Sequence, residues 1–231
     1  MSTNTVELVG HYGGDLTHAL SAWTSTSRDL DDTKKARIPG LLSMLATNGH
    51  GTPFEKSALH FLVTTDIATH IHLLKHRVGV SVNAESARYK ELREDRAYVP
   101  SDWPTDMQDA LAQHTAMGQA LYHRTLRDLK KSGMDPKRAK ETARFFLGYN
   151  TQITADIMFN FRSFVHFTRL RGAKDAQGEI RDLTNRMIDL VWATGEFDAS
   201  LEAHGFTRPL AQAPAPATGS ASPLSKSSKH E

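Results

Sequence analysis

The sequence of 231 residues contains no cysteine, so disulfides, thiolate metal ligands and thiolate nucleophiles are all excluded. It also has no run of the roughly 18 apolar residues that a membrane-spanning helix requires. Residues 1–7 lack the basic and apolar character of a signal sequence. These absences lead us to expect a cytoplasmic protein that does not bind a membrane.

The chain has little excess charge of either sign. Its 28 lysines and arginines are nearly balanced by 26 aspartates and glutamates, which gives a formal net charge of +2. A balanced chain has no general electrostatic attraction to nucleic acid, so we expect no nucleic-acid partner. Any binding of an anion must therefore depend on a local group of cations.

Three glycine-containing motifs are absent as well. The sequence has no Gly-x-Gly-x-x-Gly, no phosphate-binding P-loop and no Gly-x-Ser-x-Gly nucleophile elbow. A serine hydrolase is therefore disfavoured. A bound nucleotide must be held by cationic side chains more than by a glycine loop.

The twelve histidines raise the question of a metal site. His72 and His76 have the i, i+4 spacing of two ligands on one helix, but Leu73 follows His72 where a zinc protease has glutamate. No cysteine or carboxylate stands at ligand spacing nearby. We predict no metal site, and a histidine-based metal-binding protein is kept as an alternative.

The hydrophobic share of 39% is sufficient for a real core. We expect a single domain over residues 1–208. The segment 209–231 is rich in alanine, proline and serine and cannot bury enough apolar surface to order itself. We therefore expect a disordered tail there.

Hydrophobic periodicity predicts an α+β fold that is mainly helical with a small sheet. Strands are expected at 6–8, 57–64 and 151–160, although Ala155 leaves a helix open for the last of these. Helices are expected at 16–23, 31–48, from 67 onward, 106–131, 136–146, 162–171 and 176–194.

The helix that starts at residue 67 carries the most informative part of the chain. Asp66 is placed to cap its first turn. Its apolar stripe is formed by Ile67, Ile71 and Leu74. His72, Lys75 and His76 stand at i, i+3 and i+4, so they share a different face and are expected to project toward one site.

That helix ends in three adjacent cations, Lys75, His76 and Arg77, followed by a polar loop that closes on Ser-Ala-Arg at 86–88. Arginine and lysine form charge-assisted hydrogen bonds to phosphate oxygens that are roughly twice as strong as neutral ones. The composition therefore indicates an anion clamp. The alternative is a solvated basic helix end that complements the helix dipole.

Two further segments carry polar groups, although the first of them, taken alone, is an ordinary connection between a helix and a strand. The turn His-Gly-Thr-Pro-Phe-Glu at 50–55 presents an imidazole and a hydroxyl just before a predicted strand. In the segment 160–171, the polar set cannot all share the buried stripe of a helix, so several members must meet solvent, a ligand or a subunit. This set consists of Asn160, Arg162, His166 and Arg169.

Together the three segments resemble the flavin-dependent thymidylate synthase family over about residues 49–191. The motifs His-x-Thr-Pro-Phe-Glu, the cationic motif closing on Ser-x-Arg-Tyr, and Asn-x-Arg-Ser…Phe…Leu-Arg…Ala-Gln-x-Glu-Ile occur in the family's order and at near-family spacing. The absence of cysteine fits this resemblance, because the family does not need a thiolate to attack the pyrimidine ring.

The resemblance implies the fold of that family and a homotetramer whose active sites form at subunit junctions. It implies FAD, 5,10-methylenetetrahydrofolate as carbon donor, NADPH as reductant, and a uracil nucleotide that is methylated at C5. The positions that match flavin-contacting ones are His50, Thr52, Lys75, His76, Arg77, Asn160, Arg162 and His166. The positions at or beside nucleotide-contacting ones are His72, Lys75, Glu85, Ser86, Ala87, Arg88, Arg144 and Arg171.

Arg171 is the catalytic candidate within this set. C5 of uracil becomes a nucleophile only if negative charge builds on the N3 and O2 side of the ring, and a fixed guanidinium stabilises that charge. The alternative for Arg171 is a partner of the helix dipole. Arg144 is expected to hold the nucleotide phosphate together with the loop at 86–88.

The chain departs from the family pattern at several positions, all of which except Lys56 lie at the expected nucleotide-binding helix and loop. Lys75 replaces an arginine, His72 a glutamine and Lys56 a histidine, while one extra residue precedes Ser86 and the carboxylate of Glu85 is shifted by one position. We therefore expect a retained flavin reaction on UMP, as in the uridylate C5-methylases of polyoxin-type antibiotic biosynthesis. The alternatives are an ordinary thymidylate synthase acting on dUMP and a non-catalytic nucleotide- or flavin-binding homologue.

Overall fold

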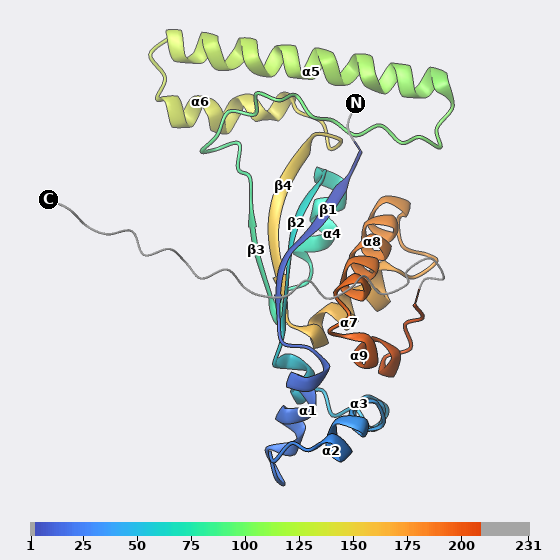
Figure 1. Cartoon of the computed structure of the whole chain (residues 1–231). Coiled ribbons are helices and arrows are strands. Elements are labelled where there is room, and N and C mark those ends of the chain that lie inside the picture. Colours follow the sequence, from blue (N-terminus) through green and yellow to red (C-terminus); the bar gives the residue numbers. More distant parts are fainter. Residues whose placement is uncertain (1–2, 209–231) are drawn as a thin grey trace, which may run out of the picture.

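The structure is a computed structural model that describes residues 3–208, and within them an antiparallel sheet has the strand order β1-β2-β4-β3 (Figure 1). Its two central strands come from distant parts of the sequence. The expected tail at 209–231 lies outside the described residues. The strands are β1 (Thr5–Tyr12), β2 (Ala58–Asp66), β3 (Val80–Ala84) and β4 (Gln152–Phe159).

Side chains alternate across the sheet, as strand geometry requires. Phe61 and Ile157 on the central strands are fully buried, whereas the neighbouring Leu62 and Met158 are 38% and 44% exposed. One face of the sheet therefore contributes to the core. Within residues 3–208, the other face is open to solvent at these positions.

Four helices lie on the core side of the sheet (Figure 1). Phe164 stacks on Phe61 with 5.8 Å between ring centroids, and Met187 and Val191 are fully buried against the same core. The helix that carries Phe164 therefore buries one face in the core and turns its other face outward. The four helices are α4 (Ile67–Leu74), α7 (Phe161–Arg171), α8 (Gly178–Thr194) and α9 (Asp198–Ala203).

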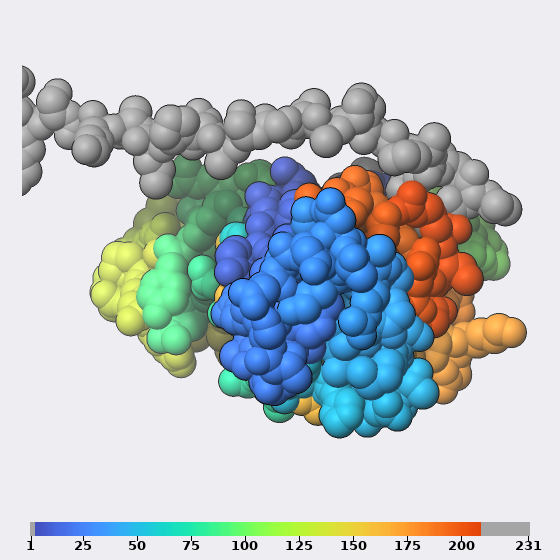
Figure 2. Space-filling view, turned by 60° about the horizontal axis from the view of Figure 1, so that its bottom comes forward, coloured from blue at the N-terminus to red at the C-terminus, as the bar shows by residue number. Residues whose placement is uncertain are grey.

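Short helices close one end of the molecule. They are α1 (Asp15–Trp23), α2 (Asp32–Ala36), α3 (Ile38–Thr47) and the 3-10 turn η1 (Thr52–Glu55). Figure 2, in which this end comes forward, shows the blue N-terminal helices beside the orange and red helices of the C-terminal part. Phe54 of η1 is buried, which ties the turn to the core and fixes its polar neighbours at the surface.

The opposite end of the sheet carries a helical hairpin made of α5 (Thr105–Lys131), α6 (Pro136–Ala143) and the 3-10 turn η2 (Arg144–Phe146) (Figure 1). Tyr122 and Leu126 of α5 pack against Ala139 and Ala143 of α6 in a small core of their own. The Tyr122 hydroxyl accepts a hydrogen bond from the Leu92 backbone N–H at 3.1 Å. The hairpin thereby holds the loop that follows β3.

Most of the predicted elements are confirmed, but their bounds differ and one expected helix is not continuous. The strand expected at 6–8 extends over the whole of β1, and the helix expected at 31–48 is divided into α2 and α3. Pro39 lies in the first turn of α3, where a proline is tolerated, and it cannot occupy a continuous helix interior. The sequence analysis also missed β3 and α9.

The buried face of α4 differs from the expected one. Asp66 caps the helix as predicted, because its carboxylate accepts a hydrogen bond from the Thr69 N–H at 2.8 Å. Ile71 and Leu74 of the apolar stripe are 38% and 42% exposed, however, while Leu73 is buried. An apolar row is therefore left on the outer side of α4 in a single chain. Within residues 3–208, no helix is both long and apolar enough to span a membrane.

Candidate active site

The loop between α4 and β3 is fixed against the start of α7. Asn160 caps α7 by accepting a hydrogen bond from the Ser163 N–H at 2.8 Å. The Ser163 hydroxyl donates to the Val78 carbonyl at 2.7 Å, and the Asn160 N–H donates to the Gly79 carbonyl at 3.0 Å. These bonds fix the direction of the preceding cations at 75–77.

Arg171, the last residue of α7, lies between two imidazole rings. Its Nε donates to His76 Nε2 at 3.0 Å, and one terminal nitrogen pairs with His72 Nδ1 at 3.3 Å. Among residues 3–208, no carboxylate forms an ion pair with Arg171. The guanidinium is therefore oriented without being neutralised by an ion pair.

His76 is buried at the base of this arrangement. Its ring meets Phe167 edge-on at 5.0 Å and lies 6.0 Å from the His166 ring. Burial, together with the positive charge of Arg171 and the neighbouring His166, lowers the pKa of His76 from 6.5 to about 4. His76 is thus neutral near pH 7, and its Nε2 is available as an acceptor for Arg171.

A surface hollow of about 270 Å³ lies over these groups. Lys75 and Arg77 are exposed in its lining, and the buried His76 and the half-buried Arg171 line it as well. Fixed cations around a hollow favour an anionic ligand. The lining residues are Lys75, His76, Arg77, Val78, Val80, Ser163, His166, Leu170 and Arg171.

The turn η1 meets the beginning of α7. Arg162 donates to the Glu55 carboxylate at 2.6 Å, and a Cβ on Gly51 would stand only 2.7 Å from Arg162 Nε. His50 and Thr52 are exposed on the same turn. A second hollow, of about 630 Å³, opens beside Glu55. Its lining consists of Tyr12, Thr17, Ser21, Thr24, Arg28, Glu55, Lys56, Ser57 and Ala58.

A second cationic group lies beyond the other end of β3. Arg88 donates through Nε to Glu141 Oε1 at 2.9 Å, and its backbone N–H donates to the Ser86 hydroxyl at 3.3 Å. Arg144 donates to the Glu141 carbonyl at 3.1 Å. Glu141 of α6 therefore contacts both Arg88 and Arg144. Ala87 lies between Ser86 and Arg88 in the loop.

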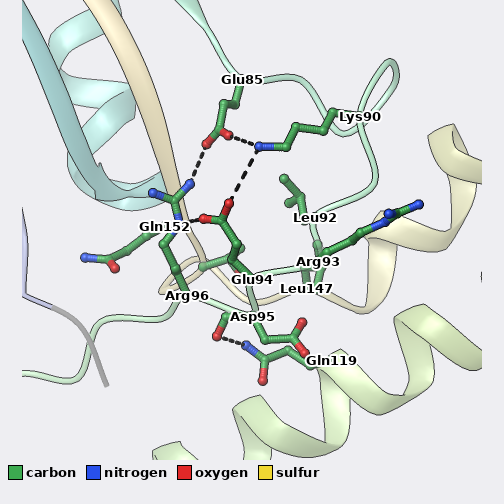
Figure 3. Close-up of a pocket in the computed structure, with 11 residues that line it drawn as sticks. Glu85, Lys90, Leu92, Arg93, Glu94, Asp95, Arg96, Gln119, Leu147 and Gln152 are labelled. Carbon is green, nitrogen blue, oxygen red and sulfur yellow. Dashed lines mark hydrogen bonds and ion pairs between the residues drawn. The ribbon is translucent and has the colours of Figure 1, made fainter.

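Glu85 holds this loop to the sheet. Its carboxylate accepts from Lys90 Nζ at 2.7 Å, from Arg96 at 2.7 Å and from the Thr154 N–H at 2.8 Å. Figure 3 shows the carboxylate between the two cations, beside a cavity of about 20 Å³, which is water-sized. Burial raises the pKa of Glu85, but the hydrogen bonds and the two positive charges lower it by more.

The candidate residues thus form two groups in one chain. The cations at 75–77, which line one hollow with Arg171, precede β3 in the chain, whereas Arg88 follows it. Five strand residues separate them, which is roughly 17 Å at about 3.3 Å per residue.

Comparison with known proteins gives the class. A family model described as thymidylate synthase complementing protein, Thy1, matches residues 7–194. The chain belongs to this family, that of the flavin-dependent thymidylate synthases. A flavin-dependent thymidylate synthase from Streptomyces avermitilis is 30% identical over 204 residues, covering 81% of this chain and 82% of the relative. Another, from Halobacterium salinarum, is 31% identical and covers 72% of this chain and 76% of the relative.

Among solved structures, the chain is similar to the UMP/dUMP methylase PolB from Streptomyces cacaoi. The PolB structure bound with 5-Br dUMP matches with a TM-score of 0.70 and 28% identity, covering 87% of this chain and 94% of PolB. The structure bound with 5-Br UMP matches with a TM-score of 0.68 and 26% identity, covering 88% and 94%. The predicted family and fold are confirmed by these similarities.

The sequence analysis did not assign a role to some residues that the structure brings into the site. Gln177 accepts a hydrogen bond from His72 Nε2 at 3.0 Å, and Glu141 joins Arg88 to Arg144. Gln177 stands in the Ala-Gln-x-Glu-Ile motif, which was a usable signal. Glu141 has no comparable motif, because its partners are set by the packing of α6.

Proposed function

We propose that this enzyme is an FAD-dependent C5-methyltransferase for a uracil nucleotide, UMP or dUMP or both. The observation that carries the proposal is the guanidinium of Arg171, which is oriented by two imidazoles and is not ion-paired within the described residues. Such a group stabilises negative charge on the N3 and O2 side of uracil, which makes C5 nucleophilic. The carbon donor in this proposal is 5,10-methylenetetrahydrofolate, and the reductant is NADPH.

The cationic hollow suits a flavin dinucleotide. When bound, FAD supplies the transfer of reducing equivalents that turns a methylene unit into a methyl group. Lys75, Arg77 and His166 line the hollow and offer donors to anionic or carbonyl oxygens. Arg162, with His50 and Thr52 on the adjoining turn, extends the polar surface toward the second hollow. Asn160 acts through the loop, because its side chain is used to cap α7.

The nucleotide phosphate fits the group beyond β3. Arg88 and Arg144 provide two guanidinium groups, and Ser86 and Ala87 provide a hydroxyl and backbone N–H groups on the same loop. Because the cations at 75–77 and the group around Arg88 flank β3 on its two sides in the chain, we propose a homotetramer in which each site takes residues from more than one chain. The carboxylate of Glu85 is bound to Lys90, Arg96 and the Thr154 N–H, so Glu85 can contact the nucleotide in this proposal only after breaking those bonds.

The choice between UMP and dUMP depends on the ribose 2′-OH. The similarity to PolB, a UMP/dUMP methylase, and the departures at Lys75 and His72 favour acceptance of UMP and a role in nucleoside antibiotic biosynthesis. The relatives named flavin-dependent thymidylate synthase favour dUMP as the second candidate substrate. Both candidates use the same flavin reaction.

The test is turnover with defined substrates. Purified protein reconstituted with FAD is incubated with NADPH, methylenetetrahydrofolate and either UMP or dUMP, and the product is identified by mass spectrometry. We expect flavin absorbance near roughly 450 nm and a methylated product from UMP. Turnover of dUMP alone excludes the ribonucleotide proposal, and flavin binding without turnover of either nucleotide identifies a non-catalytic homologue.

A further inference from the structure

Arg171 and His72 are part of a longer line of hydrogen bonds. It passes from the end of α7 through α4 to the first turn of α8. His72 Nδ1 pairs with Arg171 at 3.3 Å, and His72 Nε2 pairs with Gln177 Oε1 at 3.0 Å. Gln177 Nε2 donates in turn to Glu179 Oε2 at 2.8 Å. Four side chains are therefore connected in sequence.

The direction of every bond in this line is determined by its carboxylate end. An ionised carboxylate accepts hydrogen bonds and cannot donate them, so the amide nitrogen of Gln177 has to face Glu179. The amide oxygen then faces His72, and because this oxygen only accepts, His72 must carry its proton on Nε2. In a neutral ring with that tautomer, Nδ1 is an acceptor, which is what the guanidinium of Arg171 requires.

We propose that Gln177 and Glu179 are positioning residues for the methylation reaction, which set the tautomer of His72 and thereby hold Arg171 in place. The inference rests on the proposed function, in which Arg171 faces the uracil ring. A carboxylate placed directly on Arg171 would orient it equally well, but it would also cancel much of the charge that the reaction needs. In this line, the side chains of His72 and Gln177 separate the carboxylate of Glu179 from the guanidinium of Arg171.

The first test reads the tautomer directly, without turnover. In the flavin-loaded wild type, nitrogen-15 NMR of the His72 ring should show a protonated Nε2 and an unprotonated Nδ1. Gln177→Leu and Glu179→Leu should each give a mixture of the two tautomers. Asp182→Leu is the matched control, because Asp182 is an exposed carboxylate on the same helix, and it should leave the His72 spectrum unchanged.

A rescue variant distinguishes positioning from simple structural support. In Gln177→Glu combined with Glu179→Leu, both oxygens at position 177 accept, so no second carboxylate is needed to orient the group. This double variant should restore the Nε2 tautomer that Glu179→Leu loses. Thermal unfolding of each variant is recorded beside the spectrum, so that a folding defect is recognised as such.

Kinetics give the second readout. Because the charge on uracil develops in the transition state, Gln177→Leu should lower kcat about tenfold, the effect of losing one orienting hydrogen bond of ~1.4 kcal/mol, with little change in KM for the nucleotide. Wild-type His72 with its proton on Nδ1, or variants that match Asp182→Leu in spectrum and kcat, would overturn the inference. Absence of turnover on both nucleotides contradicts the proposed function, while the tautomer result still decides the positioning role.

Discussion

Arg171 and His76 determine each other's state at the level of single residues. The guanidinium is one reason that the pKa of His76 is low, and the neutral ring that results is the acceptor for that guanidinium. His72 Nδ1 lies 3.3 Å from the same guanidinium and is its second imidazole partner. The pair of imidazoles therefore explains how a cation can be fixed in a partly buried place without an anionic partner among the described residues.

Replacement of Arg171 by lysine tests whether the planar fork or only the charge matters. Lysine cannot donate to both rings in the same geometry, so Arg171→Lys should lower kcat about a hundredfold, as for loss of one preorganised donor. The matched control is Arg169→Lys, because Arg169 is exposed on the same helix and donates to the His204 carbonyl. Similar kcat values for the two variants would argue against a catalytic role for Arg171.

His18 makes a prediction about stability and pH. The ring is fully buried and is hydrogen bonded at 2.8 Å to both Ser57 and Ser200. Burial, helped by His204, lowers its pKa from 6.5 to about 4. The folded state thus binds fewer protons than the unfolded chain, so stability is complete above pH 6.5 and is lost as the pH falls toward about 4.

The loss from His18 amounts to at most about 3 kcal/mol in the free energy of unfolding, and His76 adds to it in the same direction. Asp15 opposes it, because burial raises the pKa of Asp15 and its folded form binds a proton more readily as the pH falls. Urea unfolding at pH 7.5, 5.5 and 4.5 measures the sum. His18→Gln should give a flatter dependence, and an unchanged slope would exclude His18 as a source.

At the level of elements, the turn into β3 depends on Gly79. Its φ of +64° and the 2.3 Å gap that a Cβ would leave to Asn160 Nδ2 both disfavour a side chain. Gly195 has a similar φ of +69°, but a Cβ there meets nothing within 4 Å. Gly79→Ala should therefore cost about 2 kcal/mol more than Gly195→Ala in urea unfolding. Equal costs would show that the clash is relieved without disturbing the cap of α7.

The same region shows what the sequence could predict and what it could not. Strong local signals were sufficient for the elements, such as the cap at Asp66 and the alternation around Phe61. The strand β3 was missed because Val80 and Val82 alternate over too few residues to stand out from a polar loop. The separation of Arg88 from the cations before β3 could not be predicted, because it depends on the pairing of that strand with β4.

The phase of α4 is a second case in which local pattern was insufficient. Periodicity identified the apolar row that contains Ile71 and Leu74, but it could not tell whether the row faces this chain's core or a second copy. The contact of His72 and His76 with one guanidinium could likewise be predicted only in part from the sequence. Their shared face could be predicted from spacing, whereas their partner Arg171 comes from another helix.

At the level of the whole molecule, the separation of the two cationic groups predicts complementation between inactive chains. Arg88→Ala and Arg171→Ala should each abolish most activity when pure. If a site takes Arg88 from one chain and Arg171 from another, mixed tetramers formed by co-expression should regain about a quarter of wild-type activity, since random mixing leaves that share of sites intact. Co-expression without recovery would show that one chain supplies both arginines.

In the proposed homotetramer, we expect the copies to meet at the exposed apolar groups on the sheet and on α4. Leu62 and Met158 on the open face, and Ile71 and Leu74 on α4, are each more than a third exposed. Leu62→Asp and Leu74→Asp should shift the protein to smaller species in analytical ultracentrifugation, because a buried charge disfavours association. Leu30→Asp, at a 37% exposed position before α2, is the control. Unchanged mass for both variants would place the interface elsewhere.

The position of β4 between β2 and β3 also governs how the protein is made. β2 can pair with β1 as soon as residue 66 has been synthesised, but its other edge has no partner until residue 159 has left the ribosome. An unpaired edge of a half-formed sheet is an aggregation hazard, and late, long-range pairing slows folding. The nascent chain therefore carries an exposed sheet edge through the synthesis of the whole α5–α6 hairpin, and we expect its yield to depend on chaperones more than the finished fold suggests.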